Sequence, residues 1–271
     1  MHYRELLSPV ADIAREACTQ ILDIYDSDFA VETKKDDSPL TQADLAAHRA
    51  IVAGLSALTP DIPILSEESA DIPFAQRRQW TRYWLVDPLD GTKEFVKRNG
   101  EFTVNIALID NGAPVLGVVW VPVTDRGYCA LVGDGAYVRC AGSSEQTAIS
   151  VRNVPPTSVS VAGSRSHGNA QTEAFISKLD KRFNEVEIQA IGSSLKFCLV
   201  AEGKVDIYPR FGPTSEWDTG AAQAVVEAAG GRVVDTSMAP LRYNTKDSLL
   251  NPHFLVFGDN SADWAQYLTN D

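Results

Sequence analysis

Apolar residues recur at helical spacing in the first part of the chain. Between positions 3 and 26 they follow a helix of about 3.6 residues per turn, at Leu6, Leu7, Val10, Ile13, Ala14, Ala17, Ile21 and Leu22. This pattern predicts an amphipathic helix over 3–26. A second helix is expected to start near Thr41, because the run from Thr41 to Asp44 resembles a capping box, in which side chains satisfy the free N–H groups of a helix start.

Short apolar runs predict the strands and later helices. In the first half, strands are expected at 62–65, 83–86, 103–109, 115–121 and 128–131, several of them separated by Gly, Asn or Asp turn signals. In the second half, strands are expected at 159–162, 186–190, 205–208, around Val233 and at 254–257, and helices at 170–179, 194–202 and 217–229. The pattern predicts a mixed α+β chain of layered sheets and helices.

A polar, proline-bearing segment at 142–156 is the best candidate boundary within the chain. It divides an N-terminal α+β half at 1–145 from a C-terminal α/β half at 156–271. We expect the two halves to form one compact catalytic unit.

Composition and charge exclude several classes of protein. The chain has 271 residues, 44% of them hydrophobic and 22% charged, which is typical of a globular protein. Its 24 Lys and Arg stand against 36 Asp and Glu, for a net charge of -12. Such an acidic chain repels a nucleic-acid polymer, so we expect no binding of DNA or RNA.

The sequence also bears on the compartment. No segment approaches the ~18 uncharged apolar residues that cross a bilayer, and the N-terminus lacks a signal-peptide pattern. The cysteines, which are Cys18, Cys129, Cys140 and Cys198, are scattered, so reduced core thiols are expected and a zinc site is not. We expect a cytoplasmic protein. Peripheral contact with the cytoplasmic face of the inner membrane and the oligomeric state are left open by the sequence.

Carboxylates at an expected strand end are the most unusual feature. An apolar strand runs into Asp87, Pro88 is expected to end the sheet ladder, and Asp90 and its following glycine form a tight turn. Asp87 and Asp90 would repel each other without a positive charge between them. Mg²⁺, which takes oxygen ligands, would satisfy both and could add the Leu89 carbonyl. A solvated turn is the alternative for this motif alone.

Two further acidic groups lie at element ends. Glu67 and Glu68 follow the strand expected at 62–65, and Asp218 opens the helix expected at 217–229. For Asp218 alone, an acid favoured by the helix dipole in the first turn is the alternative. Three separate acidic ends together predict a multi-metal site for phosphoryl transfer.

Two related chemistries are excluded by the residues themselves. The run from Asp87 to Thr92 resembles the D-x-D-G-T motif of phosphatases with an aspartyl nucleophile, but Pro88 occupies the nucleophile position. A metal-activated water is therefore the better nucleophile. The glycine-rich signatures of P-loop and dinucleotide-binding proteins are also missing from the sequence.

At these motifs the chain resembles the inositol monophosphatase superfamily of Mg²⁺-dependent, lithium-sensitive phosphatases. The resemblance rests on Glu67-Glu68, on 87–95, and on Trp217-Asp218 with the small-residue helix that ends at Gly230-Gly231. Within the superfamily, the segments 36–44, 164–167, 192–198 and 208–213 are similar to the bacterial CysQ-type 3'(2'),5'-bisphosphate nucleotidases.

The resemblance implies a fold, an activity and a cofactor. The fold is a layered α-β-α-β-α sandwich of the inositol monophosphatase and sugar phosphatase type. The activity is hydrolysis of adenosine 3',5'-bisphosphate to AMP and phosphate in sulfur metabolism. Further substrates are 3'-phosphoadenosine 5'-phosphosulfate (PAPS) and the 2',5' isomers of the bisphosphate. The cofactor is Mg²⁺, two or three ions in each active site, and the partner is a small nucleotide bisphosphate.

The resemblance also assigns the metal and catalytic residues. The metal ligands it implies are Glu67, Asp87, the Leu89 carbonyl, Asp90 and Asp218. Asp44 and Thr92, hydrogen-bonded to each other, would accept the proton of the attacking water together with Glu67. The alternative for Asp44 is the helix cap described above. The N–H groups of Gly91 and Thr92 would hold the scissile phosphate if they open a helix.

Substrate selection is expected from the second half. Besides the residues of the metal site, the contacts implied are Ser164, Arg165, Ser166, His167, Gly192, Ser193, Lys196 and Arg210. The run Gly192-Ser193-Ser194 lies at the start of an expected helix, where N–H groups bind anions. The alternatives are solvated charges at Arg165 and Lys196, a structural hydrogen bond at His167, and an ion pair between Arg210 and an acid.

One residue departs from the pattern of the superfamily, and two other functions are alternatives to the nucleotidase activity. Gly220 stands where members of the superfamily usually have Ala or Cys, at an expected cost of about 1 kcal/mol of helix stability. An inositol or fructose phosphatase would use the same metal site. A non-catalytic metal-binding or nucleotide-binding module is the second rival, although all the implied ligands and Thr92 are present.

Overall fold

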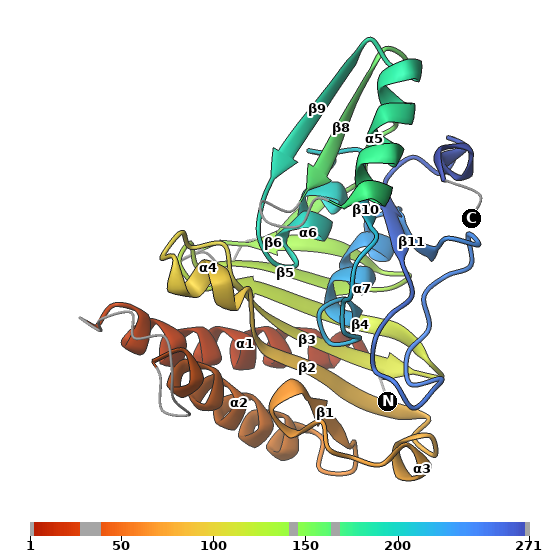
Figure 1. Ribbon diagram of the computed structural model, residues 1–271. Helices are drawn as coiled ribbons and strands as arrows, with labels where there is room; N and C mark the ends of the chain where they lie inside the picture. The colour runs from red at the N-terminus through yellow and green to blue at the C-terminus, as the bar shows by residue number, and fades with distance from the viewer. Residues whose placement is uncertain (1–2, 28–38, 141–145, 164–168, 269–271) are drawn as a thin grey trace.

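Five layers of helices and sheets stack on one another in the computed structural model, which describes residues 3–27, 39–140, 146–163 and 169–268 (Figure 1). The order of the layers is helices, a seven-stranded sheet, helices, a five-stranded sheet and helices. The α-β-α-β-α sandwich expected for this chain is therefore confirmed.

The first layer is a pair of long helices, α1 (Tyr3–Tyr25) and α2 (Pro39–Leu58). The amphipathic helix expected over 3–26 agrees with α1 almost to the residue. Helix α2 starts two residues before Thr41, at a proline, which suits a helix start because it has no N–H to leave unpaired. Thr41 and Asp44 therefore lie inside α2, and the prediction that they form its cap was wrong.

The first sheet is antiparallel apart from β1, which runs parallel to β2. In order across the sheet, its strands are β1 (Ile64–Ser66), β2 (Arg82–Asp90), β3 (Thr103–Asp110), β4 (Ala113–Val121), β5 (Arg126–Leu131), β6 (Gly135–Arg139) and β7 (Gln146–Ile149). The last two were not predicted. Because β7 lies within the segment 142–156, the first sheet extends into the region expected to be a boundary.

A bulge interrupts β2 at the acidic motif. Asp87 pairs with Asn105 and Asp90 pairs with Thr103, so three steps along β2 match two steps along β3. Pro88, which has no N–H for the ladder, lies inside this bulge. The expectation that Pro88 ends the ladder was therefore wrong, because β2 resumes its pairing at Asp90.

Short helices complete the first half. A single 3-10 turn (Glu67–Ser69) follows β1, α3 (Phe74–Arg77) precedes β2, and α4 (Thr92–Val96) follows it. Gly91 precedes α4 with a φ of 97°, and a Cβ on it would lie 3.1 Å from the Glu101 carbonyl oxygen. The tight turn expected there therefore requires glycine.

The second sheet has the order β11 (Arg232–Asp235), β12 (Phe254–Phe257), β10 (Ile207–Arg210), β8 (Ser158–Gly163) and β9 (Glu185–Ala190). Helices α6 (Leu195–Ala201) and α7 (Gly220–Ala228) lie between the two sheets, and α5 (Ala170–Arg182) and a 3-10 helix (Trp264–Tyr267) pack on the outer face (Figure 1). All the strands and helices expected in this half are present.

Helix α7 begins later than predicted. Its first residue is Gly220, so Asp218 lies in the turn before the helix rather than in its first turn. A Cβ on Gly220 would lie 2.9 Å from Cδ2 of Leu85 on β2, so glycine lets the start of α7 approach the first sheet closely. The helix cost expected for this glycine applies to helix interiors and not to a first residue.

Three apolar clusters fill the spaces between the layers. One lies between α1, α2 and the first sheet, and another between the second sheet, α5 and the last 3-10 helix. The central cluster combines residues of both halves, including Leu85 of β2 and Val225 of α7. Among the helices of the described residues, none has the length and apolar character needed to cross a membrane.

Candidate active site

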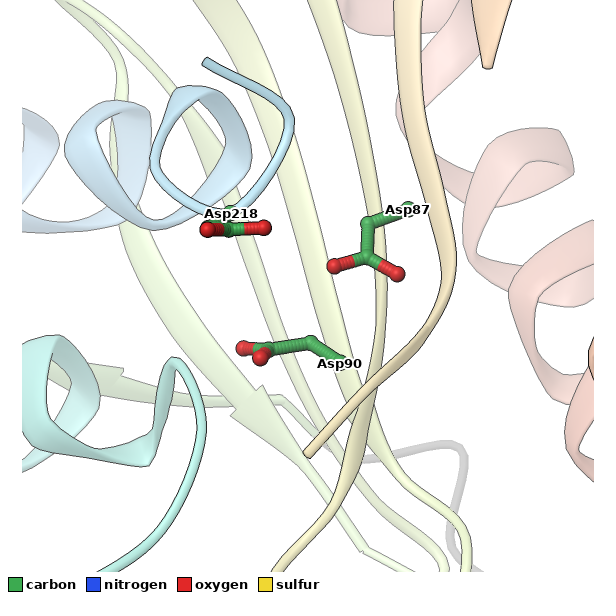
Figure 2. A group of neighbouring side chains, drawn as sticks. All are labelled: Asp87, Asp90 and Asp218. Atoms are coloured by element: carbon green, nitrogen blue, oxygen red, sulfur yellow. The ribbon is translucent and has the colours of Figure 1, made fainter. Parts of the chain in front are cut away.

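Three aspartates from the two halves meet beside the bulge of β2. Asp87 and Asp90 come from the two sides of the bulge, and Asp218 comes from the turn before α7. One carboxylate oxygen of each lies within 4.8 Å of the others. Figure 2 shows the three carboxyl groups turned toward a common space. Residues far apart in the sequence therefore converge as closely as a shared cation would require.

Backbone N–H groups orient all three carboxylates. The three bonds run from Leu89 N to Asp87 Oδ1 at 3.0 Å, from Ser194 N to Asp90 Oδ2 at 2.6 Å, and from Ser215 N to Asp218 Oδ2 at 2.8 Å. One oxygen of each acid is thus held by the main chain. The direction of each carboxylate is set by the fold itself, which leaves the other oxygen available to a ligand.

Burial and mutual repulsion oppose the ionisation of these acids. Burial, followed by the charge of Asp90, raises the pKa of Asp218 to about 8 and the pKa of Asp87 well above its ordinary value. Burial also raises the pKa of Asp90, although the nearby Lys196 opposes that shift. A divalent cation would supply the positive charge that three ionised acids need, and oxygen donors of this kind suit Mg²⁺. The residues present therefore fit the metal that the fold implies.

Glu67 is a fourth acid next to Asp87. It follows β1, whose parallel register places Ser66 beside Val86, so Glu67 comes next to Asp87. Its carboxyl group is within hydrogen-bonding distance of that of Asp87, and burial, followed by the charges of Glu68 and Asp90, raises its pKa. Glu67 therefore belongs to the same group of buried acids as the three aspartates.

Asp44 is a buried acid close to this group. It projects from α2 with 8% of its surface exposed, and among the described residues its Oδ1 has no hydrogen-bond partner. Burial, followed by the charges of Glu68 and Glu67, raises its pKa to about 8. Thr92 is the exposed first residue of α4, which packs near α2. The expected hydrogen bond between Asp44 and Thr92 is not among those that the described residues make.

A pocket of about 130 Å³ opens beside the acids. Asp90 and Asp218 form one side of it. The wall also includes residues that the sequence implied as substrate contacts, namely Gly91, Gly192, Ser193, Lys196 and Arg210. The structure thus brings contacts from both halves to one space. Ser164, Arg165, Ser166 and His167 lie outside the described residues.

Lys196 is a buried cation in the wall of the pocket. Only 7% of it is exposed, and its Nζ donates to the carbonyl oxygens of Ile191 at 3.2 Å and Ser193 at 2.8 Å. Burial lowers its pKa to about 8, while Asp90 acts in the opposite direction. The alternative that Lys196 is a solvated surface charge is therefore wrong.

Arg210 lies at the end of β10 and is held by its own loop. Its Nε donates to Thr214 Oγ1 at 2.8 Å and one Nη donates to the Pro213 carbonyl at 2.9 Å. Within the part of the chain that the structure describes, it forms no ion pair with an acid, in contrast to the alternative considered for it. Its guanidinium is therefore oriented at the pocket wall without a bound carboxylate.

Two of the three N–H groups before α6 already have carboxylate partners. Gly192 N donates to Glu101 Oε2 at 2.9 Å, and Ser194 N donates to Asp90. The expectation that this helix start holds a substrate anion is therefore not met for the N–H groups of Gly192 and Ser194, because acids of the first half occupy them. For Ser193 it stays a prediction.

Asn105 was not predicted as a site residue from the sequence, and Ser194 was expected to contact the substrate rather than the acids. Ser194 Oγ lies 2.8 Å from Asp90 Oδ2 and 2.8 Å from the carbonyl oxygen of Asp218. Asn105 Nδ2 donates to the same Oγ at 2.9 Å. A clue to Asn105 was present, since it is a polar residue between the apolar Val104 and Ile106 of a buried strand.

Known proteins resemble this chain along nearly its whole length. The model of the inositol monophosphatase family matches residues 2–262. The chain is 51% identical over 254 residues to "3'(2'),5'-bisphosphate nucleotidase CysQ" of Escherichia coli strain K12, covering 93% of this chain and 99% of that protein. The crystal structure of CysQ from Bacteroides thetaiotaomicron has a TM-score of 0.88 and 43% identity, covering 96% of this chain and 99% of that one. An inositol monophosphatase from Zymomonas mobilis, at 23% identity, shares the fold with a TM-score of 0.79 over 98% of both chains.

Proposed function

The chain belongs to the inositol monophosphatase family, and we propose that it is a 3'(2'),5'-bisphosphate nucleotidase that hydrolyses adenosine 3',5'-bisphosphate to AMP and phosphate. The observation that carries the proposal is the cluster of Asp87, Asp90 and Asp218, whose oxygens lie within 4.8 Å beside a pocket that contains Lys196 and Arg210. Such a pocket suits a substrate with two phosphate groups, one at the acids and one at the cations.

In this proposal the acids hold Mg²⁺. Asp87, Asp90 and Asp218 would hold one ion, and Glu67, Asp87 and the Leu89 carbonyl would hold a second. When bound, the ions neutralise the phosphate and lower the pKa of the attacking water toward neutrality. The backbone bonds to the three aspartates reduce the reorganisation that binding requires.

The proton of the attacking water needs an acceptor. We assign this role to Asp44, with Thr92 as the group that passes the proton, because the Oδ1 of Asp44 is buried and accepts no hydrogen bond from the residues that the structure describes. The water oxygen forms the new bond to phosphorus, and the bond from phosphorus to the ribose 3' oxygen breaks. The leaving oxygen takes up a proton and becomes the hydroxyl group of AMP.

Substrate choice follows from two of the cations in the pocket wall. Lys196 and Arg210 would contact the second phosphate, which adenosine 3',5'-bisphosphate has and inositol 1-phosphate lacks. PAPS and 2',5' isomers also carry a second charged group and belong to the same proposal. An inositol or fructose phosphatase remains the rival, since its metal site would be the same.

Phosphate release from a substrate panel tests the proposal. Adenosine 3',5'-bisphosphate, inositol 1-phosphate and fructose 1,6-bisphosphate are compared at the same concentration, with Mg²⁺ titrated from zero in a chelated preparation. The account predicts Mg²⁺-dependent release that is fastest from the nucleotide. Faster release from inositol 1-phosphate would establish the rival, and no release from any substrate would point to a non-catalytic module.

Three further properties are part of the proposal. They are inhibition by Li⁺, a cytoplasmic location and a place in sulfur metabolism. Adding Li⁺ to the phosphate-release assay tests the first of them directly. Peripheral membrane contact does not belong to the proposal.

A further inference from the structure

Ser194 joins metal-site residues of both halves through its side chain. Its Oγ contacts Asp90 of the first half and the Asp218 carbonyl of the second, and it accepts a bond from Asn105. We propose that Ser194, held by Asn105, is a positioning residue that keeps Asp90 and Asp218 at the spacing that a divalent cation requires. This inference rests on the proposed function.

The contacts of Ser194 converge on one oxygen of Asp90. Its N–H lies 2.6 Å and its Oγ 2.8 Å from Asp90 Oδ2, and Asn105 Nδ2 lies 3.5 Å from the same atom. Hydrogen bonds to a charged acceptor are about twice as strong as neutral ones. With Oδ2 engaged in this way, the carboxylate of Asp90 presents its other oxygen to the cluster.

Ser194 also acts on the position of Asp218. Its Oγ is 2.8 Å from the Asp218 carbonyl oxygen, while the Asp218 carboxylate is held separately by Ser215 N at 2.8 Å. The turn before α7 is thus tied to the start of α6 at Ser194. Because the acids repel each other, loss of the Ser194 hydrogen bonds would let the turn before α7 and the end of β2 move apart.

Asn105 fixes the hydroxyl of Ser194. It lies on β3 directly opposite Asp87 and is 1% exposed. A buried amide is costly unless it forms hydrogen bonds, so its donor Nδ2 holds Ser194 Oγ in one place at 2.9 Å. With Nδ2 donating, the serine proton is directed to Asp90 or to the Asp218 carbonyl.

Calorimetric titration of metal-free protein with Mg²⁺, in the absence of substrate, tests the inference. We expect Ser194→Ala to weaken Mg²⁺ binding about tenfold, the size of one lost bond to a charged group. Ser160→Ala is the matched control, because it removes a buried serine hydroxyl whose hydrogen-bond partner among the described residues is Gln189 of the second sheet. This control is expected to bind Mg²⁺ as the wild type does.

A second variant separates positioning from general loss of structure. Asn105→Ala acts through the same hydroxyl apart from its long 3.5 Å bond to Asp90, so the double variant should lose less Mg²⁺ affinity than the sum of the two single losses. Thermal unfolding of each metal-free variant shows whether it is folded. If Ser194→Ala does not fold, the Mg²⁺ affinity of Asn105→Ala tests the inference instead: a weakened affinity supports it, and wild-type affinity overturns it. Wild-type affinity in a folded Ser194→Ala, or additive losses in the double variant, would overturn the inference alone. A wild type that binds no Mg²⁺ would overturn the proposed function as well.

Discussion

A carboxylate oxygen of Asp87 lies within 4.8 Å of one from Asp218, although the first residue belongs to the strand β2 and the second to the turn before α7. The two side chains reach each other because α7 packs on the first sheet, with Gly220 against Leu85. Bringing two buried acids this close costs free energy because their charges repel each other. A bound cation removes that cost.

Removal of one acid should abolish turnover without unfolding the protein. Asp90→Asn retains the shape of the side chain and its bonds to Ser194, but it removes a negative charge from the cluster. We expect phosphate release to fall ~1,000-fold or more, as when charge stabilisation of a transition state is lost. Asp180→Asn, at an exposed position of α5, is the control and should leave the rate unchanged. A folded Asp90→Asn enzyme with wild-type turnover would contradict the assignment.

The stability of the metal-free protein should fall as the pH rises. Asp218 has a pKa of about 8 when folded, against an ordinary value of 3.8. Between these two pKa values the folded protein keeps a proton that the unfolded chain has lost. The free energy of unfolding therefore falls as the pH rises toward 8, where the folded protein loses that proton too. One such group changes the free energy of unfolding by ~1 kcal/mol per pH unit. Urea unfolding in chelator at pH 5.5, 6.5 and 7.5 measures it.

The variant Asp218→Asn provides the comparison for that experiment. It removes the titrating group, so its stability should depend less steeply on pH than that of the wild type. Equal slopes for the two proteins would show that the raised pKa of Asp218 does not govern the effect.

Mg²⁺ should bind more tightly at higher pH. Protons and the cation compete for the same carboxylates, and the pKa of Asp218 is raised to about 8. We therefore expect the dissociation constant to fall between pH 6.5 and 8.5 and protons to be released on binding. Titration calorimetry in two buffers of different ionisation enthalpy measures both. Binding that is independent of pH would mean that the ions bind elsewhere.

Arg210 should select for the second phosphate. Its guanidinium lies at the pocket wall without an acidic partner among the described residues, held by Thr214 and Pro213. We expect Arg210→Gln to raise the KM for adenosine 3',5'-bisphosphate ~10-fold, the size of one lost bond to a charged group. The KM for adenosine 3'-monophosphate, which lacks the second phosphate, should not change. Equal effects on both substrates would show that Arg210 does not contact that group.

An ion pair between a buried acid and a partly exposed arginine of the second half should affect stability alone. Asp206 is 1% exposed and accepts bonds from Arg152 Nε at 2.7 Å and from Ser160 N at 2.7 Å. Asp206→Ala leaves the buried N–H of Ser160 without this partner, while water can reach Arg152, so the free energy of unfolding should fall by ~2 kcal/mol. Urea unfolding measures this loss. Mg²⁺ affinity should stay the same, and a weakened affinity would place Asp206 within the metal network.

Much of the fold could be predicted from hydrophobic periodicity. Helix α1 and the buried strands β3 and β4 have long, clear patterns, and they lie close to the positions expected. Strands β6 and β7 could not be predicted in this way, because they are short and only partly buried. The place of β6 in the sheet depends on pairing with β5, and that of β7 on pairing with β6, and no local pattern records such pairings.

The acids of the site could be predicted from the sequence, but the residues that hydrogen-bond to them could not. Asp87, Asp90 and Asp218 are conspicuous because apolar segments lead to charged residues. Ser194 is an ordinary serine in the sequence, and its role becomes visible only where α6 meets β2. The position of Asp44 depended on where α2 begins, and a start two residues earlier turned an expected cap into a buried side chain.

The position of bound metal tests the central claim most directly. Crystals of the wild-type protein grown with Mn²⁺, which takes the same oxygen ligands as Mg²⁺, would reveal the ions by anomalous scattering. The account predicts one peak coordinated by Asp87, Asp90 and Asp218 and a second between Glu67 and Asp87. Peaks elsewhere, with the three aspartates unliganded, would contradict it.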